Sequence, residues 1–177
     1  MKRRNLTIIF LVLFVFLLIF IERGPWGSEE VAKYNQGYGT FDMKSYNPNV
    51  VYSVLDQMEA GGFDAYKKYF ICDNLFIVVF CIFQLLLQSY VFQWSKSKWL
   101  HRALYIVPVA RMLFDLIENI TLAHILQEYP LRLDSLVIFS SIATKAKLYF
   151  VGLWPLVMIS GIVIYIIKRR HPVNQGT

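Results

Sequence analysis

The chain has 177 residues and is 56% hydrophobic, 16% aromatic and only 17% charged. Soluble domains carry more charge and fewer apolar residues, so this composition argues against an ordinary soluble domain and indicates a membrane protein. The formal net charge of +6 comes from basic clusters beside the apolar blocks rather than from one soluble surface. Nucleic-acid binding is therefore not expected.

The first apolar block covers residues 6–22 and follows a basic start. It resembles a signal peptide, but Phe20, Ile21, Glu22 and Arg23 stand where a small-residue cleavage site would be. We therefore predict an uncleaved first span. Its basic start places the N-terminus in the cytoplasm.

Residues 23–68 form the one sizeable polar segment and are predicted to lie outside the membrane. Asn47-Pro48 is typical of a helix start, with Asn as the cap and Pro in the first turn. Apolar residues at helical spacing follow, and Gly61-Gly62 ends the pattern. This predicts a short amphipathic helix over residues 48–60, with Asp64 as the cap of the next helix.

Three more spans are predicted at residues 69–90, 103–123 and 147–167. An amphipathic lead-in over 134–143 precedes the last one. Basic residues between the second and third spans and after the fourth fall on the side of the N-terminus. We expect one all-α domain over residues 1–177: a four-helix bundle that crosses the cell membrane several times, with both ends cytoplasmic. Residues 171–177 are expected to be a disordered tail.

The third span carries four polar residues on one helical face, at spacings of three and four. They are Arg111, Asp115, Glu118 and Asn119. Ionisable groups at membrane depth are costly and indicate a functional site that faces the bundle interior. Beyond Arg111, towards the cytoplasm, this span offers no polar path.

Depth along the helices places further polar residues in the same layer. Asp73 of the second span lies at the depth of Glu118, and Lys147 lies at the outer end of the fourth span. Thr144 and Trp154 share the helical face of Lys147. If Arg111 pairs with Asp115 and Lys147 with one acid, one carboxylate is left without a cation.

Such a carboxylate could hold a proton near neutral pH, as acid–base chemistry requires. Glu118 and Asp73 are therefore the candidate catalytic residues. The candidate ligand-binding residues are Asn119, Asp115, Arg111, Thr144, Lys147 and Trp154. A fully paired network that only holds the helices together is the alternative interpretation.

No cofactor and no metal are predicted. A helix-borne di-metal site would use Glu-x-x-His, whereas Glu118 is followed by Asn119-Ile120-Thr121.

Two family resemblances follow from these motifs. The outer-loop residues Gly37 to Met43, then Asp73, Phe114 to Asn119 and Thr144 to Lys147, resemble a family of small four-span membrane proteins without an assigned activity. Phe70 to Asp73, the length and the four spans resemble the EXPERA group of sterol isomerase-like and sigma-2 receptor-like proteins. That second resemblance implies that Asp73 meets a cationic or sterol-like ligand.

The first functional hypothesis is an outer-facing polar cavity within the membrane. It binds a lipid-like or amphipathic small ligand, with acid–base chemistry as an extension. A proton-coupled transporter of small solutes is the second hypothesis, and it requires a cavity that connects both faces. The third is an accessory subunit that uses its bundle to hold a membrane-protein partner. The lipid bilayer is the surrounding partner in all three.

Overall fold

The computed structural model describes residues 3–170, and every regular element in that range is an α-helix. The prediction of an all-α chain is confirmed. Four helices are long: α1 (Arg3–Arg23), α4 (Gly62–Val91), α5 (Lys98–Glu128) and α6 (Asp134–Arg170). Two are short: α2 (Ser28–Ala32) and α3 (Pro48–Asp56). The predicted disordered tail, 171–177, lies outside the described residues.

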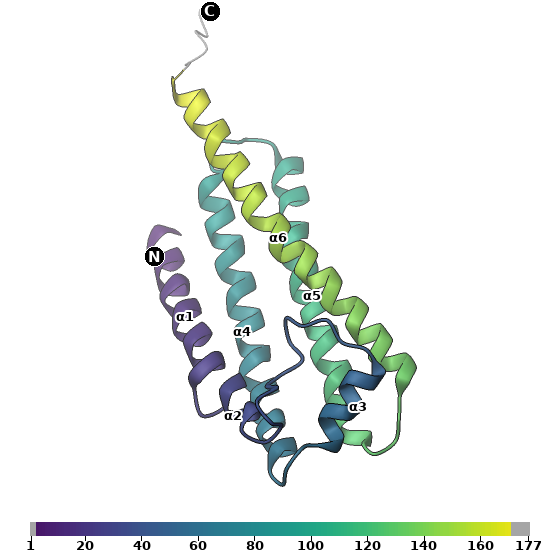
Figure 1. The fold of residues 1–177 in the computed structure, drawn as a ribbon. Helices are drawn as coiled ribbons and strands as arrows, with labels where there is room; N and C mark the ends of the chain where they lie inside the picture. The colour runs from purple at the N-terminus through teal and green to yellow at the C-terminus, as the bar shows by residue number, and fades with distance from the viewer. Residues whose placement is uncertain (1–2, 171–177) are drawn as a thin grey trace, which may run out of the picture.

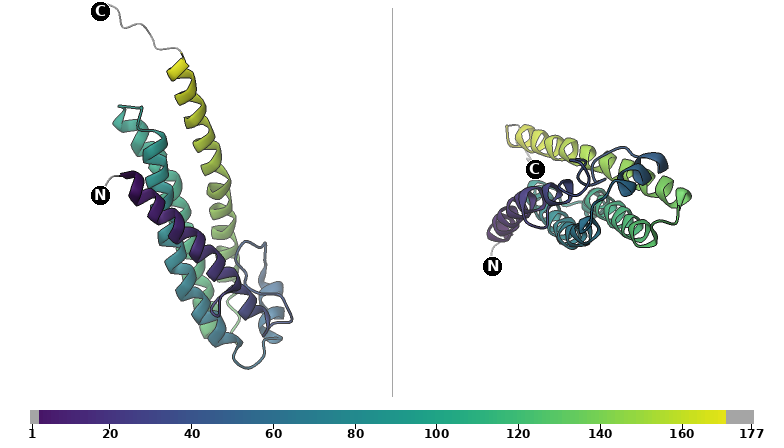
Figure 2. Two further views of the ribbon diagram at one scale, coloured as in Figure 1. Left: turned by 90° about the vertical axis from the view of Figure 1, so that its left-hand side faces the viewer. Right: turned by 60° about the horizontal axis from the view of Figure 1, so that its bottom comes forward.

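The long helices lie side by side, with α1 packed against α4, α4 against α5 and α5 against α6 (Figure 1). Helix α6 runs obliquely across α4 and α5, whereas α1 lies along the other side of α4 (Figure 2). The short helices gather at one end, here named the α3 end. The opposite end, where residues 92–97 join α4 to α5, is named the α4–α5 end. The first residues of α1 and the last of α6 point towards it.

Within the described residues, three segments are long and apolar enough to cross a membrane: Arg3–Ala32, Gly62–Val91 and Asp134–Ile167. Much of their apolar surface faces outward, as in Ile8, Leu75 and Ile159. Outward-facing apolar side chains suit a lipid surrounding and are rare over such lengths in soluble proteins. The structure therefore supports a membrane protein.

The end of α3 and the start of α4 differ from the predicted boundaries. Helix α3 begins at Pro48 as predicted, and the Asn47 side chain accepts a hydrogen bond from the Val50 amide at 3.1 Å. It ends at Asp56 rather than at residue 60. Helix α4 then begins at Gly62, so Asp64 lies in its first turn and is not its cap. Gly61 takes φ +92°, which glycine adopts without strain, and so turns the chain directly into α4.

The predicted amphipathic lead-in and the predicted fourth span lie in one continuous helix, α6, which begins at Asp134. Helix α2 was not predicted at all, because five residues are too few to show a helical period.

Gly161 holds α6 close to the end of α4. A Cβ atom on Gly161 would lie only 2.4–2.8 Å from the Phe92 ring. We expect Gly161→Ala to lower the free energy of unfolding by about 1–3 kcal/mol, because the ring must move from its packed position. Thermal unfolding in detergent would measure the change. Gly152→Ala on the same helix is the control, since its Cβ would meet nothing within 4 Å. Equal melting of the two variants would contradict the expectation.

Candidate functional site: a buried charge cluster at the α3 end

Lys147 of α6 is the centre of a buried charge cluster. Its side chain is 2% exposed, yet its ammonium group contacts three carboxylates. It lies 2.9 Å from Asp115 Oδ1 and 2.5 Å from Glu118 Oε2, and it donates a short hydrogen bond to Asp42 Oδ1. An ammonium group has three N–H donors, so one lysine can serve all three acids.

Arg111 lies deeper in the bundle and forms the expected ion pair with Asp115. Its Nη1 is 2.8 Å from Asp115 Oδ2, and its Nη2 donates to the carbonyl oxygen of Ile77 at 2.8 Å. The guanidinium carbon also lies 4.4 Å from the centre of the Phe80 ring, a favourable cation–π distance. Asp115 is thus held between two cations on two helices.

Asp73 of α4 is buried, and within the described part of the chain its carboxylate accepts a hydrogen bond from an amide and forms no ion pair. Asn119 Nδ2 donates to Asp73 Oδ2 at 2.6 Å and to Asn74 Oδ1 at 3.1 Å. A buried carboxylate without an ion-pair partner is poorly stabilised in its charged form. Asp73 is therefore the acid in the cluster with the greatest capacity for an additional cation.

One carboxylate oxygen of Glu118 accepts hydrogen bonds from two hydroxyl groups. Thr144 Oγ1 donates to Glu118 Oε1 at 2.6 Å, and the Tyr46 hydroxyl donates to the same oxygen at 3.3 Å. The Tyr46 oxygen also lies 2.8 Å from Ser140 Oγ. Burial raises the pKa of the Tyr46 phenol, and the charge of Glu118 raises it further. Tyr46 therefore stays a neutral donor.

Asp42 reaches the cluster from the loop between α2 and α3. Asn35 fixes this loop with two hydrogen bonds to Gly39, at 2.7 and 2.9 Å. The fully buried Phe41 follows, and its amide donates to the Tyr66 hydroxyl at 2.7 Å. These contacts set the backbone on both sides of Thr40, and Asp42 then extends to Lys147.

A cavity of about 210 Å³ lies beside the cluster. Asp73, Arg111, Asp115, Lys147 and Asp42 form its polar part. Its other walls are mostly apolar, with side chains from the three helices α1, α4 and α6. They include Phe14, Leu18, Ile21, Tyr69, Phe76, Phe80 and Val151. Glu22 and the exposed Met43 lie at the α3 end of the cavity.

The structure brings together seven of the eight predicted site residues: Arg111, Asp115, Glu118 and Asn119 of α5, Asp73 of α4, and Thr144 and Lys147 of α6. Trp154 lies apart from them, farther along α6, with its ring centre 6.5 Å from that of Phe83. Asp42 and Tyr46 were missed. Their positions depend on how the loop folds back onto the helices. The Gly37 to Met43 motif of the first family resemblance contains Asp42, but that motif did not assign Asp42 to the site.

The carboxylates of Asp42, Asp115 and Glu118 also have the spacing of a metal site, with oxygens within 4.8 Å of one another. The Lys147 ammonium contacts all three carboxylates, so a metal ion would have to displace a bound cation there. The arrangement suits a fixed internal cation better than an exchangeable one.

Models of known families, curated proteins and solved structures give no match to this chain.

Proposed function

We propose that this protein is a four-span membrane protein that binds an amphipathic molecule with a cationic head group in the cavity beside Asp73. The cavity itself is the observation that carries the proposal, because charged side chains line one part of it and aromatic and aliphatic side chains line the rest. Ligand sites are typically apolar pockets with a few fixed polar groups. A ligand with one charged end and one apolar part fits both surfaces.

Helix α5 is the fourth span in this proposal. Its charged residues Arg111, Asp115 and Glu118 are buried against α4 and α6, whereas Ile106, Leu113 and Ile120 are exposed. In a membrane, this places the apolar side towards lipid and the ionisable side towards the bundle interior. With four spans, α1 starts and α6 ends on one side. The positive-inside rule assigns that side to the cytoplasmic face of the cell membrane.

The charge of the cluster favours a cationic head group. Four acids, Asp42, Asp73, Asp115 and Glu118, face two bases, Arg111 and Lys147. The bases are held by Asp42, Asp115 and Glu118, which leaves Asp73 with its amide partner. An ammonium group beside Asp73 would supply the missing charge. Its neighbours Tyr69, Phe76 and Phe80 provide aromatic faces, which attract cations.

The apolar part of the ligand would follow the rings between α1 and α4. Phe14 of α1 stacks on Phe80 and Phe76 of α4, with ring centres 4.6 and 5.7 Å apart. Helix α1 buries only Leu17 and Ile21 among its described side chains, and it packs along α4. The EXPERA resemblance implies the same kind of ligand at Asp73.

We expect Asp73→Asn to reduce retention of a long-chain amine about tenfold, since one charged hydrogen bond contributes about 1.5–3 kcal/mol. The purified protein would be incubated with dodecylamine or with uncharged dodecanol, and bound molecules counted by native mass spectrometry. Asp64→Asn is the matched control, because Asp64 is exposed and pairs with Lys67 at the protein surface.

Equal retention of dodecylamine by wild type and Asp73→Asn would refute the cationic head group. Equal retention of dodecanol and dodecylamine by wild type would do the same. Glu118→Gln, measured in parallel, tests whether the Glu118 carboxylate contributes to dodecylamine binding. A Glu118 that only joins helices would leave retention unchanged.

A further inference from the structure

The half of the bundle beyond Arg111 contains polar groups that the charge cluster does not use. Helix α4 presents one row of buried side chains towards α5, here named the α4 row: Ile77, Cys81, Gln84 and Gln88. Their spacing of three and four residues keeps them on one helical face. The carbonyl of Ile77 accepts from Arg111, and Cys81 Sγ donates to the carbonyl of Pro108 at 3.6 Å.

Gln84 and Gln88 are 0% and 1% exposed. Among the described residues, none forms a hydrogen bond with the amide nitrogen or amide oxygen of either side chain. Burying an amide group without partners is costly, and more so inside a membrane. A leucine at either position would avoid that cost, so the two amides indicate something polar beside them.

Two further polar groups lie at the same depth. The indole Nε1 of Trp154 is buried and has no hydrogen-bond partner in the part of the chain that the structure describes. Its ring contacts Phe83, the neighbour of Gln84. Pro108 has no N–H, so the carbonyl of Leu104, four residues earlier, lacks its helical donor. Because α4 and α5 run in opposite directions, the residues after Cys81 lie against those before Pro108.

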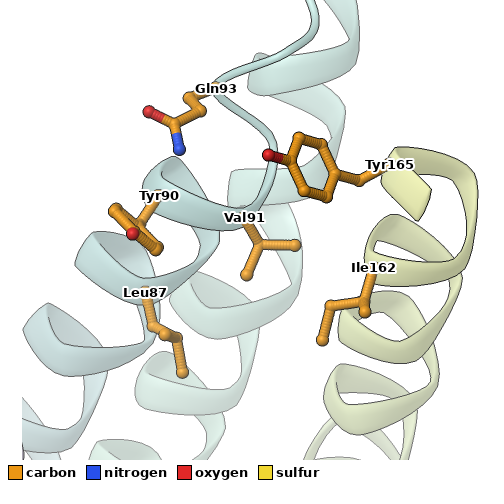
Figure 3. Close-up of a pocket in the computed structure, with 6 residues that line it drawn as sticks. All are labelled: Leu87, Tyr90, Val91, Gln93, Ile162 and Tyr165. Atoms are coloured by element: carbon orange, nitrogen blue, oxygen red, sulfur yellow. The ribbon is translucent and has the colours of Figure 1, made fainter. Parts of the chain in front are cut away.

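A cavity of about 320 Å³ continues the row towards the α4–α5 end. Leu87 and Val91 line it from α4, on either side of Gln88 in the sequence, and Ile162 and Tyr165 line it from α6. Figure 3 shows the Tyr165 ring reaching from α6 towards the end of α4, where Gln93 lies. Polar groups thus follow one another from Arg111 to the surface at this end.

We infer that a water-filled polar passage, lined by Gln84, Gln88 and Trp154, connects the α4–α5 end with Arg111. Water suits these groups because one molecule both donates and accepts, and a buried water needs two to four polar partners. Amide, indole and freed carbonyl groups supply them. The passage gives water and protons access to the charge cluster from the side opposite to the ligand cavity.

This inference does not rest on the proposed ligand. It also extends the expectation that the third span offers no polar path beyond Arg111. That expectation considered the third span alone, whereas the polar side chains come from α4 and α6.

Site-directed labelling tests the passage, because a thiol reacts with a hydrophilic methanethiosulfonate only where water reaches it. Q84C and Q88C would be made in a C72S/C81S background. Each protein would be reconstituted into two sets of sealed vesicles, one with the α4–α5 end facing the outside solution and one with the α3 end facing it. L86C is the matched control, as it lies between the two in depth and on the opposite face of α4. We expect labelling of Q84C and Q88C from the α4–α5 side at least tenfold faster than labelling of L86C.

Labelling as slow as that of L86C would overturn the passage, and so would labelling from the α3 side alone. If Q84C or Q88C fails to fold, labelling of the C72S protein tests the passage instead. Its native Cys81 lies in the α4 row between Arg111 and Gln84. Labelling of Cys81 from the α4–α5 side at least tenfold faster than labelling of L86C supports the passage. Protection of Cys81 from both sides refutes it.

Discussion

Replacing Lys147 with methionine should lower the free energy of unfolding by about 3–5 kcal/mol, the cost of removing one partner from a buried ion pair. Asp42, Asp115 and Glu118 all contact the Lys147 ammonium. Without it, three carboxylates lie close together and repel one another in a largely buried site. The loop that carries Asp42 also loses its ion pair with the bundle, so residues 33–47 should become sensitive to protease.

Thermal unfolding in detergent and limited proteolysis would measure these two effects. Lys145→Met is the matched control, because Lys145 is exposed two residues away on the same helix. Its melting temperature and cleavage pattern should match those of wild type. If Lys147→Met melts like Lys145→Met, Lys147 does not neutralise the three acids.

Arg111→Met should have the next largest effect, also about 3–5 kcal/mol. The guanidinium is 1% exposed, pairs with Asp115 and bonds the carbonyl of Ile77 on the neighbouring helix. Its loss leaves Asp115 dependent on Lys147, which two other acids already share. Thermal unfolding of the purified variant would measure the loss.

A second substitution separates charge from packing. In Arg111→Met/Asp115→Asn, the acid that lost its cation is neutral, so part of the lost stability should return. The double variant should therefore unfold at a higher temperature than Arg111→Met alone. A lower temperature would mean that Arg111 acts mainly through Ile77 and Phe80 rather than through Asp115.

Helical geometry explains why much of the cluster could be predicted from sequence. Arg111, Asp115, Glu118 and Asn119 share one helix, so their spacing alone puts them on one face. The rise per residue then places Asp73 and Lys147 at matching depths, if each helix crosses the same layer. The observed contacts of Asp73 with Asn119 and of Lys147 with Glu118 agree with that depth count.

The charge pairing could not be predicted in detail. One cation was assigned to one acid, whereas the Lys147 ammonium serves three acids with its three donors. Asp42 adds a fourth acid from a loop, and a loop has no period that could fix its depth. Its position depends on long-range contacts such as that of Phe41 with Tyr66. Trp154 follows Lys147 in helical phase but lies too far along α6 to reach the cavity.

The packing of α1 has a consequence for how the chain is made. Helix α1 is synthesised before its main packing partner α4, which begins only at Gly62. Until α4 has been synthesised, Phe14 of α1 has no ring of α4 to stack on, so the aromatic wall does not exist. The cavity is completed later still, when α6 brings Lys147 and Val151 to the side chains of α1, α4 and α5.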